Sequence, residues 1–409
     1  MKKAFFDAIM IILIILIMLT SCNNNSKTIQ LANNTYNIET DTPYFYRSGS
    51  TIEPIAKTPD GYYYVGNNGI VIYIEKDSMK ATPLCNKANC KHDNPHNCNA
   101  YLVDVVHQDY EPENGTSSNL IQYYDNHIYT LDYSYNKDKN YDQPFLVRYN
   151  LDGTEYTKIT NPLEIDGEIE DWLLHRGYFY FITNYSICRI ALDNPKSKSE
   201  VIFESVKKIE MSNNISSVNM YGDYIYFDAT TKYDEKKDVF ETSTYVLDIK
   251  TLKYKTFDNG YLPNGFFNGA LYTCCGDPDN DKMYFKKGNL NNTEMEQIET
   301  QKWTKSFFDP ERRWIKQDDA KFSASGVYTS YDADGKELYS FELEENLPSE
   351  MTPQDEDYFF FALPDEVDTN QYILFYFDKN SAGGNSELQK LCQLSWVDEN
   401  ESYLIAGDE

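Results

Sequence analysis

Residues 219–257, NMYGDYIYFDATTKYDEKKDVFETSTYVLDIKTLKYKTF, are the stretch that decides the fold. They begin with a turn and a short aromatic strand, Gly222–Phe227, followed by a polar, lysine-rich interval, Thr230–Asp238. A second strand, Tyr245–Asp248, leads through a turn into a third strand, Leu252–Phe257. Aromatic and β-branched side chains pack well on a pleated surface, and Gly and Asp suit turns. The stretch therefore predicts consecutive antiparallel strands.

Variants of the aromatic strand recur along most of the chain. With 36 Tyr and 22 Phe in 409 residues, the aromatic content reaches 15%, which favours an all-β protein. Most of these tyrosines are expected to pack between sheets, and some at loop tips to form a platform on which sugars stack. The successive copies are Tyr62–Val65, Ile128–Thr130, Tyr178–Phe181, Tyr224–Phe227, Leu271–Thr273, Trp314–Ile315 and Tyr358–Phe361.

A second repeated element sets the period. Tyr149–Glu155 (YNLDGTE) and Tyr331–Glu337 (YDADGKE) both read as a strand end, a two-residue Asp-Gly hairpin turn and the start of a new strand. They lie about 182 residues apart, or four units of roughly 45, and periods of about 40–50 residues with several short strands are typical of β-propeller blades. We therefore predict a single β-propeller, most simply with seven blades of four-stranded sheets; six or eight blades are the alternatives.

A propeller of this kind needs a strand that closes its ring, because an open ring exposes the hydrogen-bonding edges of its strands. Two segments have the composition for this role, Trp396–Ile405 near the end of the chain and Tyr44–Tyr46 near its start. The sequence does not choose between them.

The N-terminus has the pattern of a bacterial lipoprotein signal. Lys2 and Lys3 precede an apolar run, Ile9–Leu19, and Leu19–Cys22 (LTSC) matches a lipobox, in which the cysteine is lipidated and becomes the new N-terminus. The apolar run is shorter than the roughly 20 residues of a membrane span, although an uncleaved anchor stays an alternative. We predict a signal peptide over residues 1–22 with lipidation at Cys22, a flexible Asn-rich tether over 23–40, and the propeller over 41–409, held extracytoplasmically on the plasma membrane.

The formal charge of -28 limits the partners of the protein. Binding of nucleic acid or of anionic lipid headgroups requires clustered Lys and Arg, which this composition does not provide. Glycans, peptides, partner proteins and divalent metals stay open, contact with the membrane is expected only through the N-terminal lipid, and we expect a monomer. Solubility alone is an equally good reason for the charge.

An insertion between the first two aromatic strands, at about residues 83–118, carries the most specific chemistry. Cys85, Cys90, His92 and Cys98 lie close together in the chain, and three thiolates with one imidazole form a complete tetrahedral ligand set for Zn²⁺. Such a zinc site has no open position and is structural. The alternatives are a disulfide, with one cysteine left free or paired to a distant Cys188 or Cys392, and unligated thiols. His96 reads as a polar loop residue.

The lipobox, the Asn-rich tether, the Tyr-rich repeats and the run from Pro83-Leu84-Cys85 to Cys98-Asn99-Ala100-Tyr101 together resemble β-propeller lipoproteins of low-GC Gram-positive bacteria. In those proteins a similar Cys, Cys-x-His and Cys-Asn-Ala run follows an early blade. The aromatic repeats are also similar to propellers of the TolB and lipoprotein-receptor types. The resemblance covers nearly the whole mature chain and implies a surface propeller, without implying a particular reaction.

Other candidate chemistry is weaker. Asp277–Asp281 has alternate carboxylates like the start of a calcium loop, but Lys282 and Gly288 occupy the positions that such a loop gives to Gly and Glu. The vicinal Cys274 and Cys275 read as buried thiols, and no local catalytic motif is present. We therefore expect a binding platform for a glycan, peptide or partner protein, with no catalytic residues assigned. The alternative is a polysaccharide-acting glycosidase or lyase with acid/base residues in the propeller funnel.

Overall fold

The computed structural model of the protein is all-β in the part that it describes. Every named element of that part is a strand, and none of the described residues lies in a helix long and apolar enough to cross a membrane. The described residues are 36–42, 55–65, 70–92, 98–102, 121–136, 141–165, 169–205, 214–234, 239–257, 262–267, 270–277, 282–289, 295–302, 306–309, 313–318, 326–331, 337–343, 357–364, 371–378, 389–396 and 404–407.

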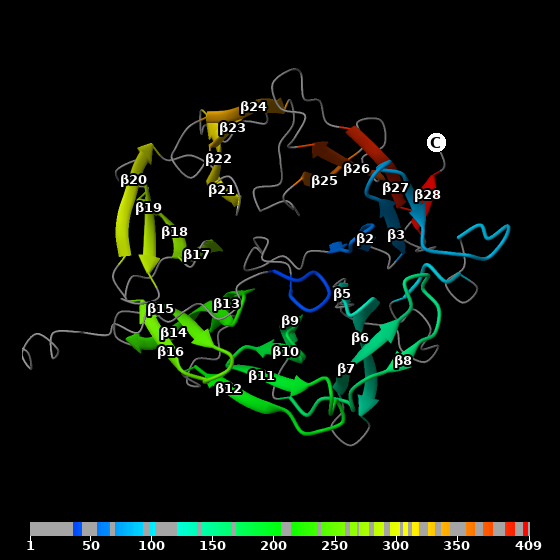
Figure 1. The fold of residues 1–409 in the computed structure, drawn as a ribbon, viewed down its shortest axis with the longest axis horizontal. Coiled ribbons are helices and arrows are strands. Elements are labelled where there is room, and N and C mark those ends of the chain that lie inside the picture. Colours follow the sequence, from blue (N-terminus) through cyan, green and yellow to red (C-terminus); the bar gives the residue numbers. More distant parts are fainter. Residues whose placement is uncertain are drawn as a thin grey trace, which may run out of the picture. The chain divides into compact units, whose positions relative to one another are not determined.

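The strands form four-stranded antiparallel sheets, each built from four strands that follow one another in the chain (Figure 1). The first four sheets are β1 (Ile55–Lys57), β2 (Gly61–Val65), β3 (Val71–Glu75) and β4 (Ala81–Pro83); β5 (Gln122–Tyr124), β6 (His127–Asn136), β7 (Tyr141–Tyr149) and β8 (Thr157–Lys158); β9 (Ile169–His175), β10 (Tyr178–Thr183), β11 (Ser186–Ala191) and β12 (Glu200–Glu204); and β13 (Ile215–Tyr221), β14 (Tyr224–Asp234), β15 (Val239–Asp248) and β16 (Tyr254–Phe257).

The C-terminal part of the chain continues the same pattern through three more sheets. They are β17 (Leu262–Phe267), β18 (Ala270–Asp277), β19 (Lys282–Asn289) and β20 (Met295–Lys302); β21 (Ser306–Asp309), β22 (Arg313–Asp318), β23 (Gly326–Tyr331) and β24 (Glu337–Leu343); and β25 (Tyr358–Pro364), β26 (Gln371–Asp378), β27 (Gln389–Trp396) and β28 (Leu404–Gly407). Successive four-stranded meanders are the topology of β-propeller blades, which confirms the predicted fold class.

The aromatic repeat corresponds to one particular strand of each sheet, with one exception. Six of its copies lie in the second strand, namely β2, β6, β10, β14, β18 and β22. The last copy, Tyr358–Phe361, lies instead in β25, the first strand of its sheet, and the second strand there is β26. Both β25 and β26 have runs of large apolar residues, so the sequence pattern alone did not separate them.

The two Asp-Gly copies occupy equivalent places, since Tyr149–Glu155 joins β7 to β8 and Tyr331–Glu337 joins β23 to β24. The expected two-residue hairpin turn is wrong for the first copy. Its positive backbone φ angles are at Gly153 and Glu155, and Gly153 N–H donates to Asn150 O at 3.0 Å. The Asp152 carboxylate accepts the N–H of Thr154, so the connection is a longer loop closed by side-chain capping.

The polar interval Thr230–Asp238, expected to separate two strands, is strand from Thr230 to Asp234, and its other residues lie outside the described part. β14 extends to Asp234 and pairs with β15 from its first residue, Val239. Pairing of the two backbones requires no apolar side chains, so the polar residues up to Asp234 continue the ladder.

Apolar faces of adjacent sheets form the core. Leu173 of β9, Tyr180 of β10 and Phe227 of β14 are fully buried in one cluster between the third and fourth sheets. The first and last described sheets also touch, because the ring centroids of Tyr62 and Phe360 are 4.9 Å apart and Lys76 Nζ lies 3.1 Å from Asp357 Oδ2.

The first candidate closing strand is not found in that role. Trp396 ends β27 and Leu404–Ile405 belong to β28, so the segment Trp396–Ile405 contributes to two strands of the last sheet itself. β28 follows β27 in the chain, and consecutive strands tend to pair because a short connection joins them. Tyr44–Tyr46 lies outside the described residues.

Candidate metal centre and the neighbouring pocket

The structure brings together the four side chains that the sequence selected as metal ligands. Cys85, Cys90, His92 and Cys98 each offer one ligand atom, and these atoms all lie within 4.8 Å of one another. His92 Nδ1 is 3.2 Å from Cys98 Sγ. Zn–S bonds of about 2.3 Å and Zn–N bonds of about 2.0 Å in a tetrahedron place the ligand atoms roughly 3.5–3.8 Å apart. The cluster therefore needs only a small contraction to hold a metal ion.

The backbone around the cluster is shaped for thiolate ligands. Asn89 and His92 have positive φ angles of 59° and 56°, which turn the chain sharply on both sides of Cys90. Burial raises the pKa of the Cys85 thiol, but hydrogen bonds from the backbone of Lys87 and Asn99 and from the other thiols outweigh it, so this pKa lies below its usual value. N–H groups directed at sulfur stabilise the anion that a metal binds.

The Cys98 thiol, which is hydrogen-bonded to Cys85, is buried more deeply than Cys85. Burial raises the pKa of Cys98 to about 12, against the hydrogen bond that it accepts from Ala100 N–H at 3.4 Å. A metal cation reverses this balance by binding the thiolate directly.

The loop that carries the ligands packs between the first and second sheets. Cys98 and Leu102 are buried, and Ala100 has no exposed surface. Ala100 O accepts the N–H of Val71 at 2.8 Å, and Tyr101 forms a bridge with Ile70 at the start of the first sheet's third strand. The insertion is thus fixed to the first sheet at Ala100 and Tyr101.

Polar contacts connect the same loop to the second sheet. Asn99 Nδ2 donates to Asn86 Oδ1 at 3.0 Å, and Asn86 Nδ2 donates to Asp152 Oδ2 at 3.2 Å in the β7–β8 connection. A Cβ atom at Gly153 would lie 2.8 Å from Asn99 O. The β7–β8 connection is therefore in close contact with the loop that carries Cys85, Cys90, His92 and Cys98, which we call the Cys/His loop. No sequence pattern predicted this contact.

The five cysteines whose side chains the structure describes are all unpaired thiols. They are Cys85, Cys90, Cys98, Cys188 and Cys392. Cys188 and Cys392, the distant partners considered for a disulfide, are buried in other sheets. His96, Cys22 and the side chains of Cys274 and Cys275 lie outside the described part, so the predictions for them stay predictions.

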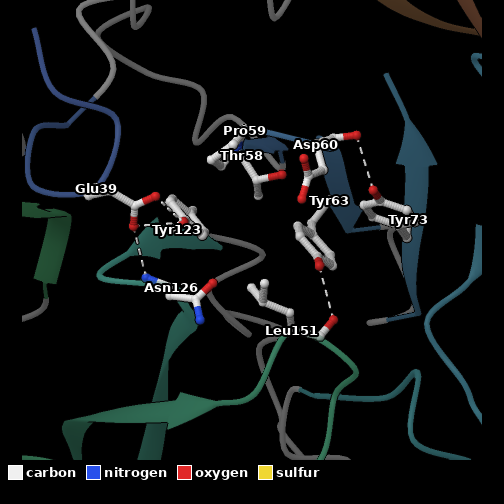
Figure 2. Close-up of a pocket in the computed structure, with 9 residues that line it drawn as sticks. All are labelled: Glu39, Thr58, Pro59, Asp60, Tyr63, Tyr73, Tyr123, Asn126 and Leu151. Atoms are coloured by element: carbon white, nitrogen blue, oxygen red, sulfur yellow. Dashed lines mark hydrogen bonds between the residues drawn. The ribbon is translucent and has the colours of Figure 1, made fainter. Parts of the chain in front are cut away.

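A pocket of about 290 Å³ lies between the first and second sheets, and Figure 2 shows the residues that line it. Glu39, Tyr123 and Asn126 lie on one side, and Asp60, Tyr63 and Tyr73 on the other (Figure 2). The remaining lining residues are Thr58, Pro59 and Leu151. The pocket is thus assembled from the first and second sheets and the segment that precedes them.

Hydrogen bonds between lining residues fix the pocket wall. Tyr63 Oη donates to Leu151 O at 2.9 Å, and Tyr73 Oη donates to Asp60 O at 3.1 Å. Tyr123 Oη donates to the Glu39 carboxylate at 2.7 Å. The ring centroids of Tyr63 and Tyr73 are 5.1 Å apart. The wall residues are therefore held in place by contacts with one another and with neighbouring backbone.

The charge of the pocket is negative. Burial raises the pKa of the Tyr73 phenol, and the nearby carboxylates of Asp60 and Glu75 raise it further. Burial likewise raises the pKa of Tyr123, with the hydrogen bond and the charge of Glu39 adding to it. The lining contains no Lys, Arg or His.

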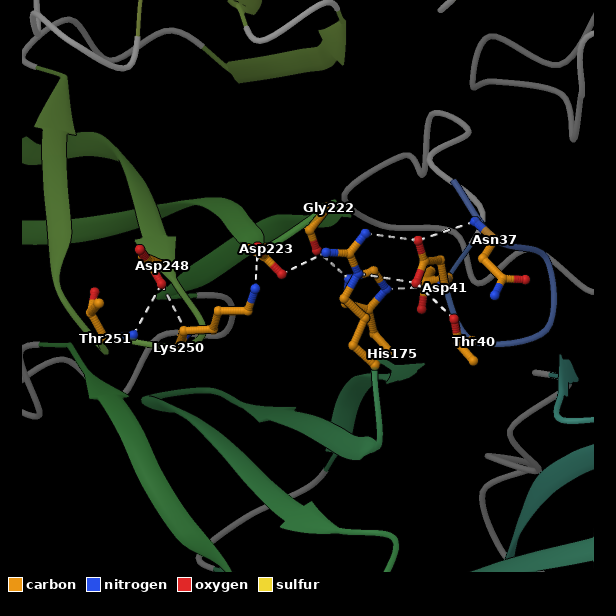
Figure 3. A network of polar contacts seen from close by, with 11 residues as sticks. Asn37, Thr40, Asp41, His175, Gly222, Asp223, Asp248, Lys250 and Thr251 are labelled. Carbon is orange, nitrogen blue, oxygen red and sulfur yellow. Dashed lines mark hydrogen bonds and ion pairs between the residues drawn. The ribbon is translucent and has the colours of Figure 1, made fainter. Parts of the chain in front are cut away.

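Residues 36–42, at the end of the expected tether, contact the second and third sheets. Arg176 connects this segment to the fourth sheet, in the network that Figure 3 shows. Asp41 receives both Nε and Nη2 of Arg176, each at 3.1 Å, and Arg176 Nη1 also pairs with Asp223. Lys250 Nζ is 2.7 Å from Asp223 Oδ2. Asp41 and Asp223 are both buried, so this charged network fixes the segment that supplies Glu39 to the pocket.

His175 has a structural position in the same region. It accepts the N–H of Thr42 through Nδ1 at 3.0 Å and donates from Nε2 to Gly222 O at 2.6 Å, which defines a neutral ring. Burial lowers its pKa, in spite of the bond to Gly222 and the nearby carboxylates of Asp41 and Asp223. His175 is thus a connector between elements and not a free acid or base.

The calcium-loop candidate of the sequence is only partly described by the structure. Asp277 ends β18, and the rest of the Asp277–Asp281 run lies outside the described residues. The pocket itself had no sequence signal, because Glu39 stands in a segment of tether-like composition and its partners are far away in the chain. The turn Thr58-Pro59-Asp60-Gly61 was the one local sign of a structured edge there.

The chain matches no protein-family model and no curated protein. Among solved structures it is similar to dipeptidyl peptidase 4 of Porphyromonas gingivalis, with 10% identity and a TM-score of 0.42 over 86% of this chain and 56% of that chain. It is also similar to an oligogalacturonate lyase in complex with manganese (11% identity, TM-score 0.41, 67% of this chain and 77% of that chain). The β-propeller domain of the Trilobed protease from Pyrococcus furiosus is a third (11% identity, TM-score 0.42, 66% of this chain and 81% of that chain). At these TM-scores no activity or residue role is transferred, and the β-propeller assignment rests on the sheet topology.

Proposed function

We propose that this protein is an extracytoplasmic lipoprotein, acylated at Cys22, whose β-propeller is a binding platform for a glycan, a peptide or a partner protein. The observation that carries the proposal is the preformed pocket between the first and second sheets. Its aromatic rings, carboxylates and amide are the groups that bind polar ligands, and their mutual hydrogen bonds already fix them in place.

The Cys/His centre has a supporting role in this proposal. Three thiolates and one imidazole favour zinc, and they fill its four positions, so the ion would fix the loop rather than activate a substrate. The loop contacts the β7–β8 connection, which supplies Leu151 to the pocket wall. Zinc at this centre thereby stabilises one side of the binding site.

The contacts of the two lining carboxylates favour binding over catalysis. Both oxygens of Glu39 accept the Tyr123 hydroxyl, and Oε2 also accepts the N–H of Asn126 at 3.2 Å. Proton transfer from Glu39 would have to break these bonds, which leaves Asp60 as the single lining carboxylate without a hydrogen bond among the described residues. Glycoside hydrolysis ordinarily uses two such groups. An enzyme with groups outside this pocket is the second candidate.

A binding and turnover experiment separates the two candidates. Detergent-solubilised full-length protein is screened on glycan and peptide arrays, and each bound glycan is then incubated with the protein in a reducing-sugar assay. We expect bound ligands without new reducing ends. Turnover of a bound glycan would replace the binding platform by the enzyme, and an array with no ligand at all would refute the platform.

The lipid anchor is tested separately by metabolic labelling with a palmitate analogue. Wild-type protein is expected to be labelled and Cys22→Ala to be unlabelled. Label retained by the variant would contradict acylation at Cys22.

A further inference from the structure

The pocket between the first and second sheets has an unusual supply of hydrogen-bonding groups. Five of its lining side chains carry a donor: Thr58, Tyr63, Tyr73, Tyr123 and Asn126. The four hydroxyl donors are already used, because Thr58 Oγ1 donates to Gly61 O at 3.0 Å and the three phenols donate to Leu151 O, Asp60 O and the Glu39 carboxylate. Only the Asn126 amide makes no hydrogen bond from its side chain among the described residues.

Acceptors, by contrast, are plentiful. A carboxylate has about four lone-pair sites, so Glu39 can accept further hydrogen bonds, and the Asp60 carboxylate makes none within the described residues. The phenolic oxygens of the tyrosines also keep a free lone pair each. A ligand that enters this pocket therefore finds many acceptors and almost no side-chain donor.

The aromatic rings of the pocket wall also favour a ligand with a positive charge. Tyr63 and Tyr73 form a tilted pair with an interplanar angle of 45°, and Tyr63 is almost completely buried. The face of an aromatic ring attracts a cation within about 6 Å of its centroid. No lining residue has a positive charge that competes for these rings or for the two carboxylates.

We propose that the pocket binds a primary ammonium group, such as that of an amino sugar or of a peptide amine, through the carboxylates of Asp60 and Glu39 and the ring of Tyr73. An ammonium group offers three donors and no acceptor, which complements the pocket. Phosphate, sulfate and carboxylate ligands are acceptors only and are repelled here. This inference rests on the proposed binding function and names the chemistry of its ligand.

Two matched ligand pairs test the proposal by calorimetric titration of the detergent-solubilised full-length protein. One pair is glucosamine and N-acetylglucosamine, and the other is glycinamide and N-acetylglycinamide; each pair differs in an ammonium against a neutral amide. We expect the ammonium ligand of at least one pair to bind about tenfold more tightly, or more, than its acetylated counterpart, because a charge-assisted hydrogen bond is lost on acetylation. The pair that responds identifies an amino sugar or a peptide amine as the source.

Asp60→Asn is the decisive variant. The Asp60 backbone carbonyl accepts Tyr73 Oη and the N–H of Lys76, and both bonds survive the substitution, so the fold of the wall is kept. We expect the variant to bind the ammonium ligand about tenfold more weakly or worse and to bind the acetylated ligand unchanged. Asp193→Asn, an exposed carboxylate between β11 and β12, is the matched control and should bind like wild type.

The outcomes separate this inference from the function on which it rests. Equal or tighter binding of the acetylated ligands, or ammonium binding that Asp60→Asn leaves unchanged, overturns the ammonium site while the array result still supports a binding platform. Titration of CaCl₂ covers the metal alternative, and Ca²⁺ binding that disappears in Asp60→Asn without any ammonium binding also overturns it. No binding of any ligand in titration or array refutes both proposals.

Discussion

The contact between the third and fourth sheets differs in chemical composition from the contact between the first and second sheets. The former is a continuous apolar cluster in which the rings of Phe203 and Phe227 are 4.7 Å apart and Phe227 stacks on Tyr245. The latter contains the Cys/His loop, with its small buried residues and a series of polar contacts to the β7–β8 connection. One interface is stable through apolar burial, whereas the other has ligand atoms grouped for a metal.

This difference indicates which of the two interfaces between sheets needs a cross-link. In the described part of the Cys/His loop the buried residues are Leu84, Cys98, Ala100, Tyr101 and Leu102, and they provide too little apolar volume for a core of their own. A metal at the cluster would connect the two ends of this loop, which already contacts both sheets. The interface between the third and fourth sheets needs no such device.

Truncation of Phe227 is expected to have the largest effect and to test the apolar interface. Phe227→Ala removes a fully buried ring and should lower the free energy of unfolding by about 3–5 kcal/mol. Urea unfolding followed by circular dichroism measures this loss. Chelation of metal before the measurement should leave the difference between variant and wild type unchanged. A difference that disappears on chelation would mean that the two interfaces are not independent.

The opposite face of the same strand gives the next effect. Asp228 in β14 is 1% exposed, and only one of its oxygens is paired, by Thr244 Oγ1 at 2.6 Å. Burial raises its pKa from 3.8 to about 8 in the folded protein, although the bond from Thr244 opposes the shift. Ionisation therefore works against folding, and this loss of stability begins above pH 3.8 and is complete above about pH 8.

Asp228→Asn removes that charge and should stabilise the protein in a pH-dependent way. The variant and wild type are expected to be equally stable near pH 4, and the advantage of the variant should grow by several kcal/mol up to about pH 8. Thermal melting across this pH range measures the difference. An advantage that does not change with pH would show that the buried carboxyl is not the cause.

The sequence predicted that the four Cys and His side chains lie together but did not predict the pocket, and distance along the chain explains why. Cys85 and Cys98 belong to one loop, so their spacing alone indicated a common site. The pocket combines Glu39, Asp60, Tyr123 and Leu151, which come from separate elements, and no local pattern connects them. The aromatic repeat likewise marked the second strand of a sheet wherever only one strand there had a prominent aromatic run. It was misplaced at β25, where two adjacent strands have the same composition.

Removal of a metal ligand tests the other half of the comparison. Cys98→Ala should reduce bound zinc to background and lower the free energy of unfolding by about 2–3 kcal/mol, at the upper end for a single substitution, because the buried loop loses its cross-link. Elemental analysis of protein purified under reducing, metal-replete conditions measures the zinc. Cys188→Ala, a buried free thiol of the third sheet, is the control and should keep its metal.

The same measurement on wild type can contradict the zinc centre. Absence of stoichiometric zinc, together with a mass that shows two thiols lost, would assign a disulfide to the cluster. The Cys/His loop would then still be cross-linked, and the contrast between the two interfaces would stand with a different chemistry.

The smallest predicted effect isolates the contact between the Cys/His loop and the β7–β8 connection. Gly153 and Gly177 have similar positive φ angles of 75° and 84°, so an alanine at either position has a similar backbone strain. A Cβ at Gly153 would also lie 2.8 Å from Asn99 O, whereas a Cβ at Gly177 would meet nothing within 4 Å. The difference between the two variants therefore measures only the contact with the loop.

We expect Gly153→Ala to lower the free energy of unfolding by about 1 kcal/mol more than Gly177→Ala, because Asn99 must move to accommodate the methyl group. Asn99 contributes a backbone hydrogen bond to the Cys85 thiol, so Gly153→Ala should also weaken zinc retention against a competing chelator, and Gly177→Ala should not. Equal destabilisation by the two variants, with equal zinc retention, would mean that the β7–β8 connection does not support the metal loop. The pocket wall at Leu151 would then be independent of the metal centre.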